Sequence, residues 1–145
     1  MEAATEVASA TDFVDRFTAA WDAPSVERLN ALLHPDVELI QPLQPPLRGL
    51  RDVTAAWNRI FGLIPDLRGD VLSSAVEGDD VFIELKLGGT VAGTRIEWVT
   101  LDRIKLRDGL VLQRIANFDS LVIIRQLVRH PRALAAFAKS QLSRG

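Results

Sequence analysis

Three stretches of alternating side chains, separated by turn residues, dominate the second half of the sequence. They are predicted to form a meander of β-strands at Val81–Leu87, Arg95–Arg107 and Leu110–Asn117. Asp108-Gly109 between the last two is a strong signal for a two-residue hairpin turn. A meander of this kind requires a largely antiparallel sheet with one face against a core.

The middle strand of the meander carries a carboxylate in its apolar row. Alternate residues of this strand are mostly apolar, and Asp102 stands among them: Ile96, Trp98, Asp102, Ile104 and Leu106. A carboxylate on an apolar face is paired, protonated or used in function. Inside a pocket, burial would favour its uncharged form and a role as acid or hydrogen-bond donor. The alternative is a β-bulge that turns Asp102 to solvent, because Val99 and Leu101 are apolar too.

Composition limits the function classes. The chain has 145 residues, which is the size of one domain. It has no Cys and only His34 and His130, so neither thiol chemistry nor a metal site is expected, and we expect no cofactor. A net charge of -2 argues against a nucleic-acid surface. The first residues are acidic and Ala-rich, so we expect no signal peptide, no membrane contact and a cytoplasmic protein.

The remaining segments alternate between helical and strand patterns. We expect helices at Asp12–Asp22, after the N-cap Ser25 as far as Leu33, from Gly49 or Leu50 to Ile64, and at Ser120–Arg129. Short strands are expected at Val37–Gln41 and Val71–Val76. Residues 1–10 are expected to form a flexible arm, with Thr11 as the first N-cap, and residues 11–145 a single domain. Helices segregated from a mostly antiparallel sheet predict an α+β fold. The sheet would wrap on the three helices of the N-terminal half, with a further helix at the C-terminus.

Two segments are expected at the mouth or bend of such a sheet. Pro42–Gly49 contains three prolines and predicts a stiff loop. Gly88-Gly89 is expected to break or bulge its strand. The interior of the curved sheet would then be the ligand pocket.

Several short motifs, in this order, resemble the SnoaL-like family of the nuclear transport factor 2-like superfamily, which has the cystatin-like fold. The motifs are Ala31–Val37, Glu77–Val81, Gly89-Thr90, Arg107–Val111 and Asn117–Asp119, followed by a helix with Arg125-Gln126-Leu127. The resemblance extends over about residues 11–128. It implies a cone-shaped α+β barrel that holds an apolar small molecule and forms a homodimer through the outer face of its sheet.

The known chemistries of this superfamily fit the sequence unequally. Ketosteroid isomerases have a Tyr and a general-base Asp at positions that match Phe17 and Gln41 here. Their third group, a protonated Asp that donates to an oxyanion, aligns with Asp102. The Asp of the epoxide hydrolase relay is replaced by Ala116. The resemblance to polyketide cyclases, which use an acidic pocket residue, leaves Asp102 and secondarily Asp119 as acid/base candidates.

These considerations yield a set of candidate site residues. Asp102 and Asp119 are the catalytic candidates, although Asp119 directly precedes a helix and is predicted to cap it. The substrate-binding candidates are aromatic or amide side chains: Phe17, Trp21, Gln41, Trp57, Trp98 and Asn117. At least one of the three Trp side chains is expected to belong only to the core.

Two functions therefore remain open. The first is a small-molecule-binding domain that acts as a cofactor-independent cyclase, isomerase or hydrolase on a polyketide-like or terpenoid-like substrate. The second is a non-catalytic binding or assembly module of the same fold. A carboxylate that faces a cavity and has a shifted pKa would favour the first function, and the absence of such a group would favour the second.

Overall fold

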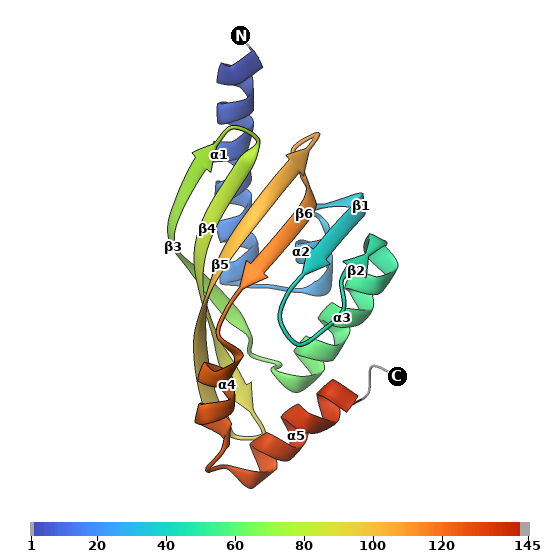
Figure 1. The fold of residues 1–145 in the computed structure, drawn as a ribbon, viewed down its shortest axis with the longest axis vertical. Coiled ribbons are helices and arrows are strands. Elements are labelled where there is room, and N and C mark those ends of the chain that lie inside the picture. Colours follow the sequence, from blue (N-terminus) through green and yellow to red (C-terminus); the bar gives the residue numbers. More distant parts are fainter. Residues whose placement is uncertain (1, 143–145) are drawn as a thin grey trace.

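The computed structural model describes residues 2–142, which form a curved sheet and the helices around it (Figure 1). The helices within this range are α1 (Glu2–Asp22), α2 (Val26–Asn30), α3 (Gly49–Leu63), α4 (Ser120–Leu127) and α5 (Pro131–Leu142). The strands are β1 (Leu33–Ile40), β2 (Leu47–Arg48), β3 (Arg68–Glu77), β4 (Asp80–Val91), β5 (Thr94–Arg107) and β6 (Leu110–Asn117). The expected α+β fold is confirmed.

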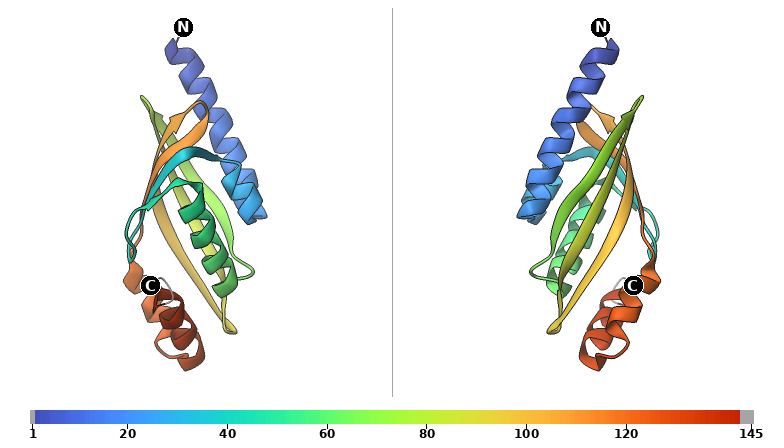
Figure 2. Two further views of the ribbon diagram at one scale, coloured as in Figure 1. Left: turned by 90° about the vertical axis from the view of Figure 1, so that its right-hand side faces the viewer. Right: turned by 90° about the vertical axis from the view of Figure 1, so that its left-hand side faces the viewer.

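The sheet has the strand order β2-β1-β6-β5-β4-β3 and is antiparallel except where β1 runs parallel to β6. It curls past α3, with α1 and α2 on the same side (Figure 2). The strands β2 and β3 remain its two edges, so the sheet is curved but does not close into a complete barrel. The concave side, filled by the helices of the N-terminal half, is where the core lies.

Strand β5 shows the predicted alternation without a break from Ile96 to Lys105. Its even-numbered side chains are buried, and its odd-numbered side chains are exposed. Asp102 is 1% exposed, so its predicted place on the inner face is confirmed and the solvent-facing alternative is wrong. The turn at Asp108-Gly109 has positive φ at both residues, as a two-residue hairpin turn requires.

The expected break at Gly88-Gly89 is wrong, because β4 pairs with β5 continuously through both glycines. Gly89 is needed for close packing. A Cβ atom on Gly89 would meet the side chain of Ile64 and lie 3.3 Å from the Cα atom of Leu67. Glycine therefore lets the segment after α3 lie directly on the strand.

The first helix begins at Glu2, so the expected start at Asp12 with Thr11 as N-cap is wrong. The segment before Asp12 is rich in Ala and Glu, which have high helix propensity, and contains neither Gly nor Pro. The first turns of α1 extend past the end of the sheet (Figure 1). Among residues 2–142, no helix is both long enough and apolar enough to span a membrane.

The last two helices lie together at the end of the sheet opposite the start of α1 (Figure 1). Pro131 begins α5, which has 12 residues. α5 contacts α3 and α4, and α4 contacts β5. The helices α4 and α5 thus close the space between α3 and the sheet from below.

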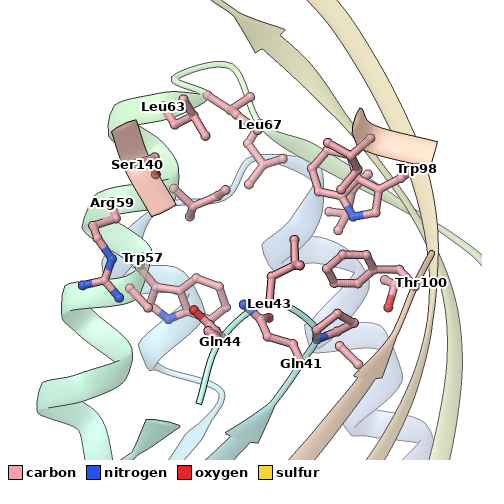
Figure 3. A pocket seen from close by; sticks show the side chains of 18 of the residues that line it. Gln41, Leu43, Gln44, Trp57, Arg59, Leu63, Leu67, Trp98, Thr100 and Ser140 are labelled. Carbon is pink, nitrogen blue, oxygen red and sulfur yellow. The ribbon is translucent and has the colours of Figure 1, made fainter. Parts of the chain in front are cut away.

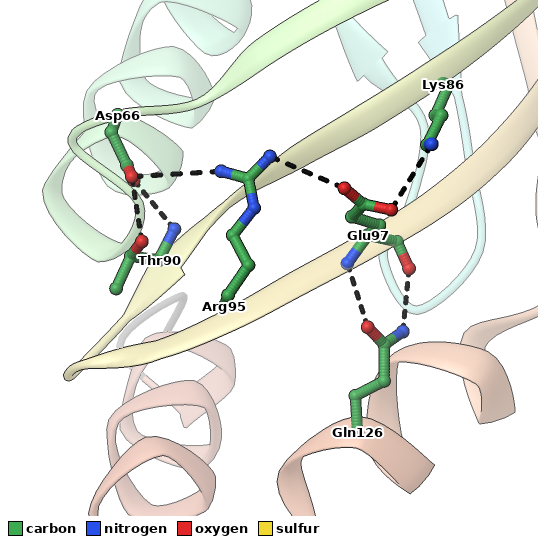
Figure 4. A network of polar contacts seen from close by, with 6 residues as sticks. All are labelled: Asp66, Lys86, Thr90, Arg95, Glu97 and Gln126. Atoms are coloured by element: carbon green, nitrogen blue, oxygen red, sulfur yellow. Dashed lines mark hydrogen bonds and ion pairs between the residues drawn. The ribbon is translucent and has the colours of Figure 1, made fainter.

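Gln126 connects α4 to β5 by hydrogen bonds to the backbone of Glu97 (Figure 4). Its Oε1 accepts from the Glu97 amide at 2.8 Å, and its Nε2 donates to the Glu97 carbonyl oxygen at 2.7 Å. Pairing between β5 and β6 extends only from Leu101 to Arg107, so Glu97 has no β6 partner on that side. The side chain of Gln126 therefore forms the backbone hydrogen bonds that a neighbouring strand would otherwise form with Glu97.

A cavity closed by an arginine–aspartate pair

A cavity lies between α3, the inner face of the sheet and the C-terminal helices (Figure 3). Its walls are mainly apolar, and the loop that follows β1 contributes Gln41, Leu43 and Gln44. In Figure 3, Trp57 on α3 lies across the cavity from Trp98 and Thr100 on the sheet. Phe137 and Ser140 of α5 complete the lining. Segments far apart in the sequence thus meet around one space.

An ion pair closes the sheet side of this cavity. Arg114 lines the cavity, and its Nε and NH2 atoms both donate to Oδ2 of Asp102, at 2.8 and 2.6 Å. The other carboxylate oxygen, Oδ1, accepts from the hydroxyl of Thr100 at 2.8 Å. The two charged side chains are only 9% and 0% exposed, so the pair is isolated from water. Charge-assisted hydrogen bonds of this kind hold a guanidinium group in a fixed orientation.

A β-bulge places Arg114 on the inner face. The register between β5 and β6 shifts between Lys105 and Leu106, so that Asp102 pairs with Ala116 and Ile104 pairs with Arg114. A shift of one residue moves every later side chain of β6 to the opposite face. Arg114 thereby becomes the diagonal neighbour of Asp102.

Two aromatic rings support the guanidinium group from α1. The Cζ atom of Arg114 lies 5.8 Å from the ring centroid of Phe17 and 5.7 Å from that of Trp21. Both rings are within range of a cation–π interaction. The orientation of Arg114 is therefore fixed from two sides, by a carboxylate and by aromatic faces.

The predicted substrate-binding residues separate into two groups. Trp21, Gln41, Trp57 and Trp98 all line the cavity. Phe17 is 2% exposed and lies in the core beneath Arg114, outside the cavity lining.

Asn117 does not reach this cavity. Its side chain is exposed and donates to the carbonyl oxygen of Leu101, in a shallow depression of the outer sheet face. As the residue after Ala116, it points to the opposite side of β6. The expectation that Asn117 lies in the inner pocket is therefore wrong.

The two carboxylate candidates occupy different environments. Asp102 is buried behind Arg114 and Thr100, and both of its oxygens accept hydrogen bonds from those neighbours. Asp119 is the N-cap of α4 and accepts from the Leu121 amide at 2.9 Å, as its structural interpretation predicted. Neither carboxylate lines this cavity, and their catalytic roles stay predictions.

Arg114 and Thr100 are the site residues that sequence reasoning missed. Thr100 stands in the apolar row of β5, two residues before Asp102, and that position was a usable signal. Arg114 had no comparable signal, because without the bulge the Asp108-Gly109 turn would pair it with Arg103 on the outer face.

The charged groups of the cavity limit its chemistry. Among the residues that the structure describes, its lining includes Arg59 and Arg114 but no Asp, Glu or His. Within the same range, no group of three or more His, Cys, Asp or Glu side chains is placed to hold a metal ion. The arrangement can bind an oxygen acceptor or stabilise negative charge on one, because Arg is a donor only.

Comparisons with known proteins agree with this architecture. IdmH from Streptomyces antibioticus, a putative polyketide cyclase, has a TM-score of 0.70 and 20% identity over 82% of this chain and 98% of its own. TsrD from Streptomyces laurentii has a TM-score of 0.69 and 26% identity over 83% and 95% of the two chains. TerC, which was co-crystallised with polyporic acid, has a TM-score of 0.73 and 17% identity over 83% and 98%.

A comparison by sequence alone assigns the family. No curated protein sequence matches the chain. The family model of the SnoaL-like domain matches residues 14–114, which include the ion pair of Asp102 and Arg114. This chain therefore belongs to the SnoaL-like domain family.

Proposed function

We propose that this protein binds a flat, largely apolar small molecule, polyketide-like or terpenoid-like, whose carboxylate or enolate oxygen lies against Arg114. The observation that carries the proposal is a buried guanidinium group that faces an apolar cavity. Asp102 holds that group from behind, and Trp57 and Trp98 offer flat walls to a ring system. A ligand oxygen would complete the hydrogen bonds of the guanidinium group.

The charge of the cavity supports an acidic ligand. The chain as a whole has a net charge of -2, whereas the described lining residues include two arginines and no carboxylate. An electrostatic interaction inside an apolar space is stronger than the same interaction in water. The similar fold of TerC, co-crystallised with polyporic acid, supports an acidic ligand as well.

Catalysis of the cyclase or isomerase type is the second candidate. Arg114 could stabilise an enolate that forms on a bound ketone, which is the oxyanion contribution to such reactions. The likeness to the putative polyketide cyclase IdmH favours this activity. Because no carboxylate or His of the described range lines the cavity, the proton would have to move through the ligand itself or through water. We therefore propose binding as the function that the geometry supports best.

Binding of fluorene carboxylate, a flat aromatic acid, tests the proposal. Isothermal titration calorimetry should show tighter binding of the acid than of its uncharged methyl ester, by about 10-fold, since a hydrogen bond to a charged group contributes roughly 1.5–3 kcal/mol. The preference should be lost in Arg114→Met, with circular dichroism confirming that the variant is folded. Equal binding of acid and ester by the wild-type protein would contradict the proposal.

Arg59→Met is the matched control for this experiment. Arg59 is the other arginine of the lining, is only partly buried and has no carboxylate partner in the described range. The acid preference should persist without it, because the ordered guanidinium group is that of Arg114. If the acid preference disappears in Arg59→Met instead, the anion binds at Arg59 and its assignment to Arg114 is wrong.

We propose further that two copies of the chain associate through the outer face of the sheet. This face exposes large apolar side chains of neighbouring strands: Leu72, Phe82, Val99 and Leu101, which are 39–57% exposed. Exposed apolar patches of this kind are typical of interaction surfaces. Sedimentation velocity should give a dimer for the wild-type protein and a monomer for Leu101→Glu, and a monomeric wild-type protein would exclude this interface.

A further inference from the structure

Two nitrogen donors in the cavity have no hydrogen-bond acceptor. The indole Nε1 of Trp57 and the amide Nε2 of Gln44 are buried, and neither has a partner in the described part of the protein. Both residues line the same cavity (Figure 3). Trp57 is only 9% exposed, so bulk water has little access to its N–H group.

A buried donor without an acceptor carries the full penalty of its desolvation. Native proteins leave few such groups, and each one requires an explanation, such as a functional role or a bound water or ion that supplies the missing atom. The two donors without a partner differ in what they reveal about the missing ligand atom. The amide of Gln44 can present either its oxygen or its nitrogen, whereas an indole N–H can only donate. Trp57 therefore determines that the missing group is an acceptor.

The position of the Trp57 indole is fixed by its neighbours. Its ring packs edge-on against Trp21, with centroids 6.1 Å apart and an interplanar angle of 82°. Gln44 stands in the loop between β1 and β2, next to Pro45 and two residues after Pro42. Proline fixes the backbone of such a loop, so the acceptor position is pre-organised.

We propose that the cavity contains a second subsite, at Trp57 and Gln44, for a neutral carbonyl oxygen of the ligand. This inference rests on the proposed function and adds to it: the ligand would be a keto acid, with its anionic oxygen at Arg114 and its ketone at Trp57. The neutral donors Trp57 and Gln44 suit a neutral carbonyl, and the charged donor Arg114 suits the anion. The two donor sites thus select the orientation of a flat ligand and the positions of its ketone and its anionic oxygen.

Pairs of probe ligands test the subsite: one ligand has a ketone, and the other has a CH₂ group in its place. Several positional isomers of fluorenone carboxylate would be titrated into the full-length protein, each beside the fluorene carboxylate that lacks the ketone. At least one ketone should bind about 5-fold more tightly than its counterpart, which is the size expected for one neutral hydrogen bond. This ketone preference should disappear in Trp57→Phe.

Trp98→Phe is the matched control, because it removes the same atoms from the opposite wall. The indole nitrogen of Trp98 is not among the buried atoms without a partner. Trp98→Phe should weaken the binding of both ligands of a probe pair equally and leave the preference for the ketone intact. A preference that survives in Trp57→Phe, or one that Trp98→Phe abolishes, would overturn the assignment.

A measurement on the wild-type protein keeps the test decisive if Trp57→Phe does not fold. The indole proton resonance of Trp57 should move downfield with the preferred ketone and not with its fluorene counterpart. Equal binding of every probe pair would overturn the carbonyl subsite and leave the proposed function standing. If none of the acids binds, the proposed function fails, and the subsite fails with it.

Discussion

Two clusters of arginine and carboxylate side chains are built on β5, one inside the molecule and one outside. The inner cluster is Asp102 with Arg114, whose side chains are 0% and 9% exposed. The outer cluster consists of surface side chains that are 44–59% exposed, and it is drawn in Figure 4: Asp66, Lys86, Arg95 and Glu97. Both clusters pair carboxylates with cationic side chains, and they differ in their access to water.

Their geometry differs accordingly. The inner pair has N···O distances of 2.6 and 2.8 Å, whereas the ion pairs of the outer cluster have distances of 3.3, 3.6 and 4.0 Å. In water an ion pair between long side chains gains little, because solvent screens the charges and the side chains lose conformational freedom. Inside, an unpaired charge is so costly that the partner must be held close.

From this comparison we expect that burial, and not the number of charged groups, decides how much an ion pair contributes to stability. The inner pair makes a guanidinium group available inside an apolar cavity and depends on both partners. The outer pairs form a solvated surface on the strands that hold the cavity wall. Loss of one partner should therefore have very different consequences in the two places.

The largest effect is expected from Arg114→Met, which leaves the Asp102 carboxylate buried without its counter-charge. The free energy of unfolding should fall by about 3–5 kcal/mol, the cost typical of breaking a buried pair. Urea denaturation followed by circular dichroism measures this quantity. The matched outer variant, Arg95→Met, should change it by less than about 1 kcal/mol, because its partners remain solvated.

The double variant Arg114→Met, Asp102→Leu sharpens the comparison. Removing both charges should recover most of the stability lost in Arg114→Met, because apolar replacement of a buried pair is often neutral or stabilising. Equal destabilisation by Arg114→Met and Arg95→Met would refute the distinction between the clusters. A double variant no more stable than Arg114→Met would show that packing, and not charge, is what the arginine supplies.

An intermediate effect is expected at the point where α4 meets the outer cluster. Gln126→Ala removes both hydrogen bonds to the Glu97 backbone, and we expect a loss of about 1–2 kcal/mol. The Glu97 amide should then exchange its proton with solvent faster, as hydrogen exchange followed by NMR would show. Because the neighbouring helix α5 lines the cavity, ligand affinity should fall as well.

Gln126→Glu is the control that separates the two hydrogen bonds. A carboxylate can still accept from the Glu97 amide, but it cannot donate to the Glu97 carbonyl oxygen. Protection of the Glu97 amide should therefore be largely retained while the stability falls. An unchanged exchange rate in Gln126→Ala would mean that this side chain does not hold α4 on β5.

Much of the fold could be predicted from local patterns. The alternation of β5 and the Asp108-Gly109 turn are properties of neighbouring residues, so the sequence indicated the inner face for Asp102, although Val99 and Leu101 left a solvent-facing alternative open. Gly88-Gly89 was misjudged because its reason lies elsewhere in the chain: Ile64 packs where a Cβ atom would be. Local sequence cannot distinguish a glycine that bends a strand from one that admits a neighbour.

The candidate site was predictable only where it follows alternation or composition. Trp57, Trp98 and Gln41 were predicted to face the ligand, and they line the cavity. The partner of Asp102 was not predicted, because Arg114 reaches the inner face through a bulge that no sequence signal marks. Side-chain pairing across strands depends on register, and one residue of shift changes the whole site.

The smallest effect is expected at Asp66 in the outer cluster. Hydrogen bonds from the side chain and then the backbone of Thr90, with a further contribution from Arg95, lower the pKa of this carboxyl. A carboxyl with a lower pKa in the folded state stabilises the protein above its unfolded pKa, which is about 3.9. The contribution is lost as the pH falls from there through the folded-state pKa. It should stay below about 1 kcal/mol, because the side chain is 52% exposed.

Thr90→Val tests this cause, because it removes the hydroxyl that donates to Asp66 and keeps the shape of the side chain. An NMR titration should show that the pKa of Asp66 rises toward its ordinary value, and the loss of stability on acidification should begin at a higher pH. Thr90→Ser retains the hydroxyl and should leave the pKa of Asp66 low. If both variants titrate alike, the Thr90 hydroxyl is not the main cause. The outer cluster would then depend on Arg95 more than its distance of 4.0 Å from Asp66 suggests.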